Sequence, residues 1–82
     1  MKVDGRIIEP KAIEACINRM KSGPFAASDI TRIAIANGVP EKIGFGFVAR
    51  RVTSRLIEKA KKTNSIKVGP PFPTWTPVEH KS

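Results

Sequence analysis

The stretch VARRVTSRLIEKAKKTNSIKVG, residues 48–69, decides the fold, because the spacing of its hydrophobic residues changes within it. Val48, Val52 and Leu56 recur every four positions, and residues spaced in this way share one face of a helix. The spacing predicts a helix from about residue 45 to residue 62, with its apolar face packed inward.

The hydrophobic spacing then changes to the alternation that is typical of strands. Asn64 tolerates the left-handed conformation and is expected to end the helix. Ile66 and Val68 alternate with polar residues, and a second alternation covers residues 74–78 after the proline-rich segment 69–73. Because prolines restrict strand pairing to edges, this part of the sequence predicts a short, protruding two-stranded β-hairpin.

Two shorter helices are predicted upstream. The first begins at Pro10. Proline has no backbone N–H, and at the first position of a helix that N–H would have no partner within the helix. Its apolar stripe consists of Ile13, Cys16, Ile17 and Met20. The second helix has Ser28 as its N-terminal cap, places the Asp29 carboxylate at the positive end of its dipole, and ends near Asn37.

The connection between the second and third helices contains Gly44 and Gly46, which weaken helix formation. Residues 41–46 are therefore expected to form a loop or a distorted first turn. The triplet around Phe45 lacks the lysine of a phosphate-binding loop, so it predicts no nucleotide site. From the sequence we expect almost no exposed aromatic side chains. This expectation argues against a protein that binds single strands by stacking aromatic rings on unpaired bases.

The charge of the chain favours a polyanionic partner. Fifteen Lys and Arg residues against seven Asp and Glu residues give a net charge of +8, and the sequence pI is about 10.3. Residues 50–67 hold seven of the cations against the single Glu58, so a net charge of +6 is concentrated there. Four of these cations form one helical stripe, namely Arg51, Arg55, Lys59 and Lys62. Alternatively, this stripe is an ordinary solvated helix face that binds no polyanion.

Several other classes of function find no support in the sequence. Cys16 has no partner for a disulfide, and His80 is expected to be solvated near the polar C-terminus, so no metal site or cofactor is predicted. No paired carboxylate and no nucleophile with a histidine base can be recognised, so we expect no enzyme. No segment has the apolar length of a signal peptide or a membrane span, and we expect a cytoplasmic protein without membrane contact, associated with the nucleoid if it binds DNA.

Three helices followed by a two-stranded hairpin resemble the winged helix-turn-helix fold. The run Ala34-x-x-x-Gly38 is similar to the second helix of that fold, and residues 48–62 resemble its recognition helix. The resemblance implies an α+β, mostly helical domain: a three-helix core followed by a C-terminal hairpin wing. It covers residues 10–78, leaving 1–9 as an N-terminal arm and 79–82 as a disordered tail.

The resemblance also implies a recognition helix in the major groove of DNA and a wing beside it. The base-reading candidates are Arg50, Thr53 and Ser54. The phosphate-contact candidates are Arg51, Arg55, Lys59, Lys62 and Lys67. Alternatively, Arg50 pairs with Glu41 or Glu58, and the other two base-reading candidates are ordinary helix surface.

Two aromatic residues of the hairpin receive different expectations. Phe72 lies between prolines at the wing tip and is a candidate contact for DNA or for a protein, or else packs back on its own loop. Trp75 is expected to pack within the hairpin or on the core rather than to stack on a base.

These observations predict a small nucleic-acid-binding protein. The leading hypothesis is a duplex-DNA-binding regulator of transcription, or a protein of DNA processing on a mobile element, that could act as a homodimer on a two-part site. The alternatives are a winged-helix module that binds a protein partner through the Phe72 loop, and a basic protein associated with RNA or the ribosome.

Overall fold

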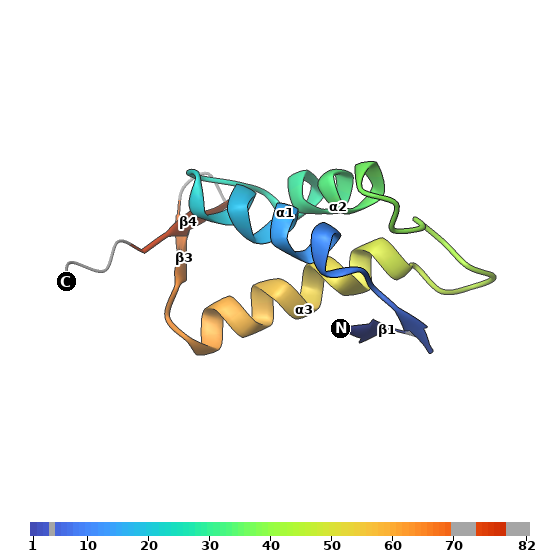
Figure 1. The fold of residues 1–82 in the computed structure, drawn as a ribbon. Helices are drawn as coiled ribbons and strands as arrows, with labels where there is room; N and C mark the ends of the chain where they lie inside the picture. Colours follow the sequence, from blue (N-terminus) through green and yellow to red (C-terminus); the bar gives the residue numbers. More distant parts are fainter. Residues whose placement is uncertain (4, 70–73, 79–82) are drawn as a thin grey trace.

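The computed structural model describes residues 1–3, 5–69 and 74–78, and it has three helices and two antiparallel strand pairs (Figure 1). The fold is therefore of the α+β class. The helices are α1 (Pro10–Lys21), α2 (Ala27–Ala36) and α3 (Val48–Lys62). The strands are β1 (Lys2–Val3), β2 (Arg6–Ile7), β3 (Ile66–Gly69) and β4 (Thr74–Pro77).

The core lies where the three helices meet. In Figure 1, α1 and α2 lie above α3, which runs along the lower side of the molecule. The largest fully buried side chains of the core are Phe25, Ile30, Val3, Val48, Val52 and Cys16. Cys16 and Met20 of the predicted α1 stripe are buried, and Ile13 and Ile17 pack against them in part. The predicted inward face of α1 is confirmed.

The prediction that Ser28 caps the second helix is wrong. The helix begins at Ala27 after the cap residue Ala26, so Ser28 lies inside the first turn and does not cap it. The Asp29 carboxylate takes that role, because its Oδ2 accepts a hydrogen bond from the Ala26 N–H at 2.9 Å. A side chain three residues into a helix can reach back to the cap, and Asp29 also complements the helix dipole there.

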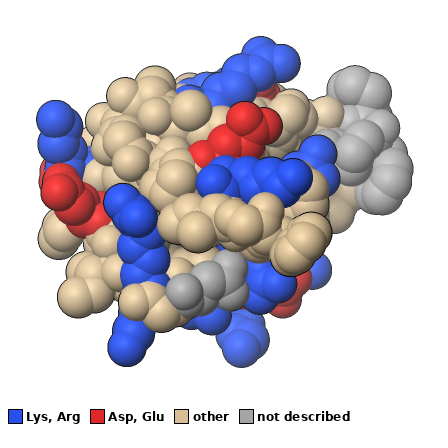
Figure 2. Space-filling model, turned by 90° about the vertical axis from the view of Figure 1, so that its right-hand side faces the viewer, with Lys and Arg blue, Asp and Glu red and all other residues tan. Residues whose placement is uncertain are grey.

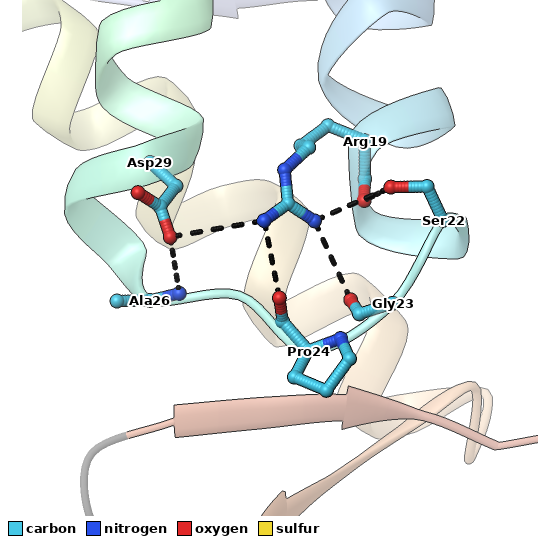
Figure 3. A network of polar contacts seen from close by, with 6 residues as sticks. All are labelled: Arg19, Ser22, Gly23, Pro24, Ala26 and Asp29. Atoms are coloured by element: carbon cyan, nitrogen blue, oxygen red, sulfur yellow. Dashed lines mark hydrogen bonds and ion pairs between the residues drawn. The ribbon is translucent and has the colours of Figure 1, made fainter.

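Arg19 holds the corner between α1 and α2 (Figure 3). Its guanidinium donates to the carbonyl oxygens of Gly23 at 3.5 Å and Pro24 at 3.1 Å, and to the Ser22 hydroxyl at 3.3 Å. It also lies 4.0 Å from Asp29 Oδ2. One planar cation therefore satisfies carbonyl groups of the turn and reaches the carboxylate that caps the next helix.

The third helix begins at Val48 and not near residue 45, which agrees with the alternative of a loop over residues 41–46. Ile43 and Gly46 form an isolated antiparallel bridge, so a tight turn stands where the helical spacing suggested a first helical turn. At the other end, Asn64 has a φ of 54°, the left-handed conformation expected of it.

The strand pair after α3 is confirmed, with Val68 opposite Trp75 and Lys67 opposite Thr76. An unexpected bridge joins it to the turn between α1 and α2. The Phe25 N–H donates to the Trp75 carbonyl at 2.8 Å, and the Trp75 N–H donates back at 2.7 Å. Trp75 is half-buried and packs against the core, as predicted. The pair is therefore fastened to the helices and does not stand alone.

The N-terminal strand pair was not predicted, because residues 1–9 were expected to form an arm. Val3 and Ile8 are buried in the common core. The Ile8 N–H donates to the Met1 carbonyl at 2.8 Å, and the pair contacts α3. The predicted disordered tail, residues 79–82, lies outside the described residues.

Candidate nucleic-acid interface

The two sides of α3 have different roles. Its buried positions recur as adjacent pairs, one pair per helical turn: Val48, Ala49, Val52, Thr53, Leu56 and Ile57. The positions between and after these pairs are exposed, apart from the half-buried Ala60, and they include every cation of the helix: Arg50, Arg51, Arg55, Lys59, Lys61 and Lys62. A single helix therefore supplies both the core and a positively charged face.

The predicted stripe of four cations is exposed over its whole length. Three of its members, together with Ser54 and Glu58, line a shallow, open depression of about 350 Å³. These three are Arg55, Lys59 and Lys62. The only acidic residue of the depression, Glu58, lies 3.5 Å from Lys61. Because that pair is exposed, it reduces the positive potential beside the stripe only weakly.

Arg55 has a structural contact as well as a place in the stripe. Its Nη1 donates a hydrogen bond to the Lys2 carbonyl oxygen at 2.7 Å, which fastens β1 to α3. A guanidinium carries five N–H donors, so this bond uses only part of its capacity. Arg55 is therefore held in place within the stripe, and a substitution there changes both the charge of the stripe and the contact to the N-terminal strand pair.

Two of the three base-reading candidates are exposed near the start of α3, namely Arg50 and Ser54. The guanidinium of Arg50 lies over the Phe47 ring, 5.2 Å from its centroid. This cation–π contact orients the side chain toward the N-terminal end of the helix. Among the described residues, Arg50 forms neither of the alternative ion pairs, with Glu41 or with Glu58, and the Glu58 carboxylate pairs with Lys61.

The structure removes Thr53 from the base-reading set. Its side chain is only 2% exposed and lies between α3 and α2. The Thr53 hydroxyl is 2.8 Å from the Thr31 hydroxyl of α2 and donates to the Ala49 carbonyl at 3.0 Å. The sequence prediction was wrong because a threonine within a polar run resembles surface, although its position beside Val52 places it on the buried face.

Lys67 of β3 is exposed, as its proposed phosphate contact requires. A groove of about 880 Å³ lies between the ends of α1 and α3 and the β3–β4 pair, and Lys21, Lys59 and Lys67 all line it. The strand pair thus adds a cation to the charged end of α3. The wing-tip candidate Phe72 lies outside the described residues.

The Lys61 side chain makes contacts within the protein. Its Nζ lies over the Trp75 ring, 5.4 Å from the centroid, in addition to its ion pair with Glu58. These contacts attach the end of α3 to the strand pair that follows it. Lys61 is therefore left out of the set of candidate phosphate contacts.

The connection before α3 carries a feature that the sequence analysis missed. Phe45 is fully exposed and Phe47 is 45% exposed, and Lys42 Nζ lies 5.6 Å from the centroid of the Phe47 ring. The argument that exposed aromatic residues are nearly absent is therefore wrong. The available signal was a phenylalanine between two glycines, outside any helical or strand spacing.

Figure 2 views the molecule from the end that carries this connection. Basic side chains are spread over this face, with acidic ones between them, and several project from the lower half, where α3 and the N-terminal strands lie in Figure 1. Net charge alone does not define a patch on this face. The ordered cations of α3 define the candidate interface.

Cys16 is a buried residue of the core. Burial raises the pKa of the Cys16 thiol, whose sulfur lies 3.7 Å from the Ile30 carbonyl oxygen. In residues 1–3, 5–69 and 74–78, no three His, Cys, Asp or Glu side chains cluster as a metal site would require. Over the same residues, no helix has the length and apolar character needed to cross a membrane.

Comparison with protein-family models, with curated proteins and with solved structures found no match to this chain. The functional argument is therefore carried by the geometry and charge of α3 and its neighbours.

Proposed function

We propose that the chain is a nucleic-acid-binding protein whose contact surface is the exposed face of α3. More specifically, it is a winged-helix domain that binds duplex DNA, with α3 in the major groove and the β3–β4 pair beside it. The observation that carries this proposal is the exposed stripe Arg51, Arg55, Lys59 and Lys62 on the side of α3 that faces away from the core.

The order of the elements supports the winged-helix arrangement. Three helices precede a two-stranded antiparallel pair, and the turn before α2 joins that pair through the reciprocal hydrogen bonds of Phe25 and Trp75. This bridge fixes the strand pair against the helices at the C-terminal end of α3. A wing held in this way can contact the same duplex as the helix before it.

The dimensions of α3 suit the major groove. An α-helix with side chains is about 10–12 Å across, and the groove is about 12 Å wide. The stripe from Arg51 to Lys62 extends over about 16 Å at 1.5 Å per residue. Duplex DNA presents about ten negative charges over that length. Phosphate contacts would therefore relieve the mutual repulsion of the four cations.

The first turns of α3 are the part proposed to read sequence. Arg50 and Ser54 are exposed there, and an arginine can bind guanine O6 and N7 with two hydrogen bonds worth about 1–3 kcal/mol of discrimination. Arg50→Ala is expected to narrow the affinity gap between a selected target and random DNA. Because contacts to phosphate carry no sequence information, Lys59→Ala is expected to weaken both equally.

The test is the salt dependence of duplex binding, measured by fluorescence anisotropy on a random-sequence duplex. Four phosphate contacts predict a slope of log affinity against log salt of about −3.6, which is a loss of about 150-fold between 50 and 200 mM salt. Lys59→Ala is expected to reduce the slope by about 0.9. Lys11→Ala is the matched control, because this exposed lysine of α1 lies outside α3 but carries the same charge.

The two variants separate docking from bulk charge. Equal changes for Lys59→Ala and Lys11→Ala would show that only net charge matters, and the proposal for α3 would fail. No binding of wild-type protein at 50 mM salt would exclude duplex DNA as the ligand. Stronger competition by RNA than by duplex DNA would favour the RNA alternative instead.

A further inference from the structure

The connection between α2 and α3 presents apolar side chains to solvent. Phe45 is fully exposed, Ile43 is 46% exposed and Phe47 is 45% exposed. Burying a phenylalanine side chain is worth about 1.5–3 kcal/mol, and Phe45 contributes none of this to the fold. Single exposed apolar residues are ordinary, but three within five consecutive positions make a local apolar surface.

The turn that carries Phe45 is closed by its own backbone. The Ile43 N–H donates to the Gly46 carbonyl at 2.9 Å, and the Gly46 N–H donates to the Ile43 carbonyl at 2.9 Å. Gly44 has a φ of 59°, which a glycine adopts without strain. Phe45 is thus presented at the tip of a hydrogen-bonded turn, so less conformational entropy is lost when it binds.

Two cations lie at the base of this turn. The Phe47 ring has Lys42 Nζ at 5.6 Å and the Arg50 guanidinium at 5.2 Å from its centroid. Figure 1 shows the connection extending beyond the start of α3, at the end where the base-reading candidates lie. Phe45 is therefore an apolar tip on a cationic base, next to the proposed reading end of the helix.

The partner of such a tip must be polyanionic outside and apolar inside. A second copy of this chain, with a net charge of +8, would bring like charges together around the tip. Duplex DNA meets both requirements, because its phosphates are anionic and its stacked bases present apolar faces. Apolar side chains of proteins that bind the minor groove are known to enter between base steps and to kink the duplex.

We propose that Phe45 inserts between neighbouring base pairs when α3 docks, so that the ligand is duplex DNA with a locally unstacked step. This inference rests on the proposed function. Pyrimidine–purine steps are the preferred insertion point, because they unstack most easily. The protein then combines phosphate contacts from the stripe, edge contacts from Arg50, and a deformation contact from Phe45.

The test compares wild-type protein with Phe45→Ala on duplexes that contain 2-aminopurine at a TA or CA step. Wild-type protein is expected to raise the fluorescence of the probe, because 2-aminopurine brightens when it is unstacked. Phe45→Ala is expected to lose this signal and to bind about tenfold more weakly. Its salt slope should stay unchanged, since the side chain carries no charge. Ile35→Ala is the control, because Ile35 is a 39% exposed apolar residue on α2, outside α3 and the β3–β4 pair.

The outcomes separate this inference from the proposed function. If wild-type protein binds with the expected salt slope but Phe45→Ala binds and brightens the probe equally, the wedge is wrong and the α3 interface stands. If Phe45→Ala loses affinity only for single strands, duplex insertion is refuted in favour of stacking on unpaired bases. If wild-type protein shows no salt-dependent duplex binding, the proposed function fails and the wedge fails with it.

Discussion

Replacing Thr53 by valine separates its structural role from a role in reading bases. Three contacts meet at two hydroxyl groups: Thr53 to Thr31 at 2.8 Å, Thr53 to the Ala49 carbonyl at 3.0 Å, and Thr31 to the Ala27 carbonyl at 3.1 Å. Two protons can serve only two of the three contacts. The short contact between the hydroxyls requires one of those protons, so the bond between α2 and α3 is present in each favourable arrangement.

Thr53→Val removes that bond at nearly constant volume. The net worth of such a bond is about 0.5–1.5 kcal/mol, and the Thr31 hydroxyl keeps the Ala27 carbonyl as its acceptor, so no buried donor is left unsatisfied. A loss of about 1 kcal/mol corresponds to a fall in Tm of about 4–8 °C for a domain of this size. Ser54→Ala, at the exposed neighbouring position, is expected to change stability by less than about 0.5 kcal/mol.

The assay is thermal and urea unfolding of Thr53→Val, Thr31→Val and the double variant, combined with anisotropy titrations on target and random duplexes. The cycle is expected to give a coupling of about 0.5–1.5 kcal/mol between the two threonines. Discrimination between the duplexes should stay at the wild-type value. Unchanged stability together with lost discrimination would refute this reasoning and restore Thr53 as a base-reading residue.

Three further predictions concern the fold around α3. Arg55→Ala is expected to speed amide exchange at Ile8 about fivefold, since about 1 kcal/mol of hydrogen bonding to β1 is lost; unchanged exchange would contradict the contact. Arg19→Lys is expected to destabilise the protein almost as much as Arg19→Ala, by about 1 kcal/mol in urea unfolding, because an ammonium cannot reach the same fork of acceptors; full rescue by lysine would show that charge alone suffices. Burial raises the pKa of the Cys16 thiol above its ordinary 9.0, so the unfolded chain loses the thiol proton at a lower pH than the folded chain does. The free energy of unfolding is therefore expected to fall above about pH 9, by at most about 1.4 kcal/mol per pH unit. Equal pH slopes for wild-type protein and Cys16→Ala in urea unfolding would rule this out.

Elements with a long, regular hydrophobic spacing could be predicted from the sequence. The inward stripe of α1 and the strand pair after α3 follow from local spacing, and Asn64 adopts the expected left-handed conformation. The N-terminal pair could not be predicted, because two residues per strand are too few to show alternation. Its place depends on burial of Val3 and on the distant contact from Arg55, which no local pattern encodes.

The candidate interface was predicted in composition but not in detail. Charge and helical spacing were enough to place the stripe, because they depend only on positions along one helix. The assignment of Thr53 failed because it depends on which side of α3 meets α2. The exposure of Phe45 was missed because an apolar residue is expected to be buried, and only the closed turn between Ile43 and Gly46 shows that it is held outside.

The division of α3 into two sides makes stability and binding separable by substitution. Buried pairs such as Val52 and Thr53 supply the core contacts, whereas the stripe residues Lys59 and Lys62 are exposed and their substitution costs little folding energy. Arg55 joins the two roles through its bond to Lys2. Loss of DNA affinity in a lysine variant therefore reports on docking, whereas the same loss in Arg55→Ala combines docking with a loosened N-terminus, so Lys59 is the residue on which the proposed interface should be judged.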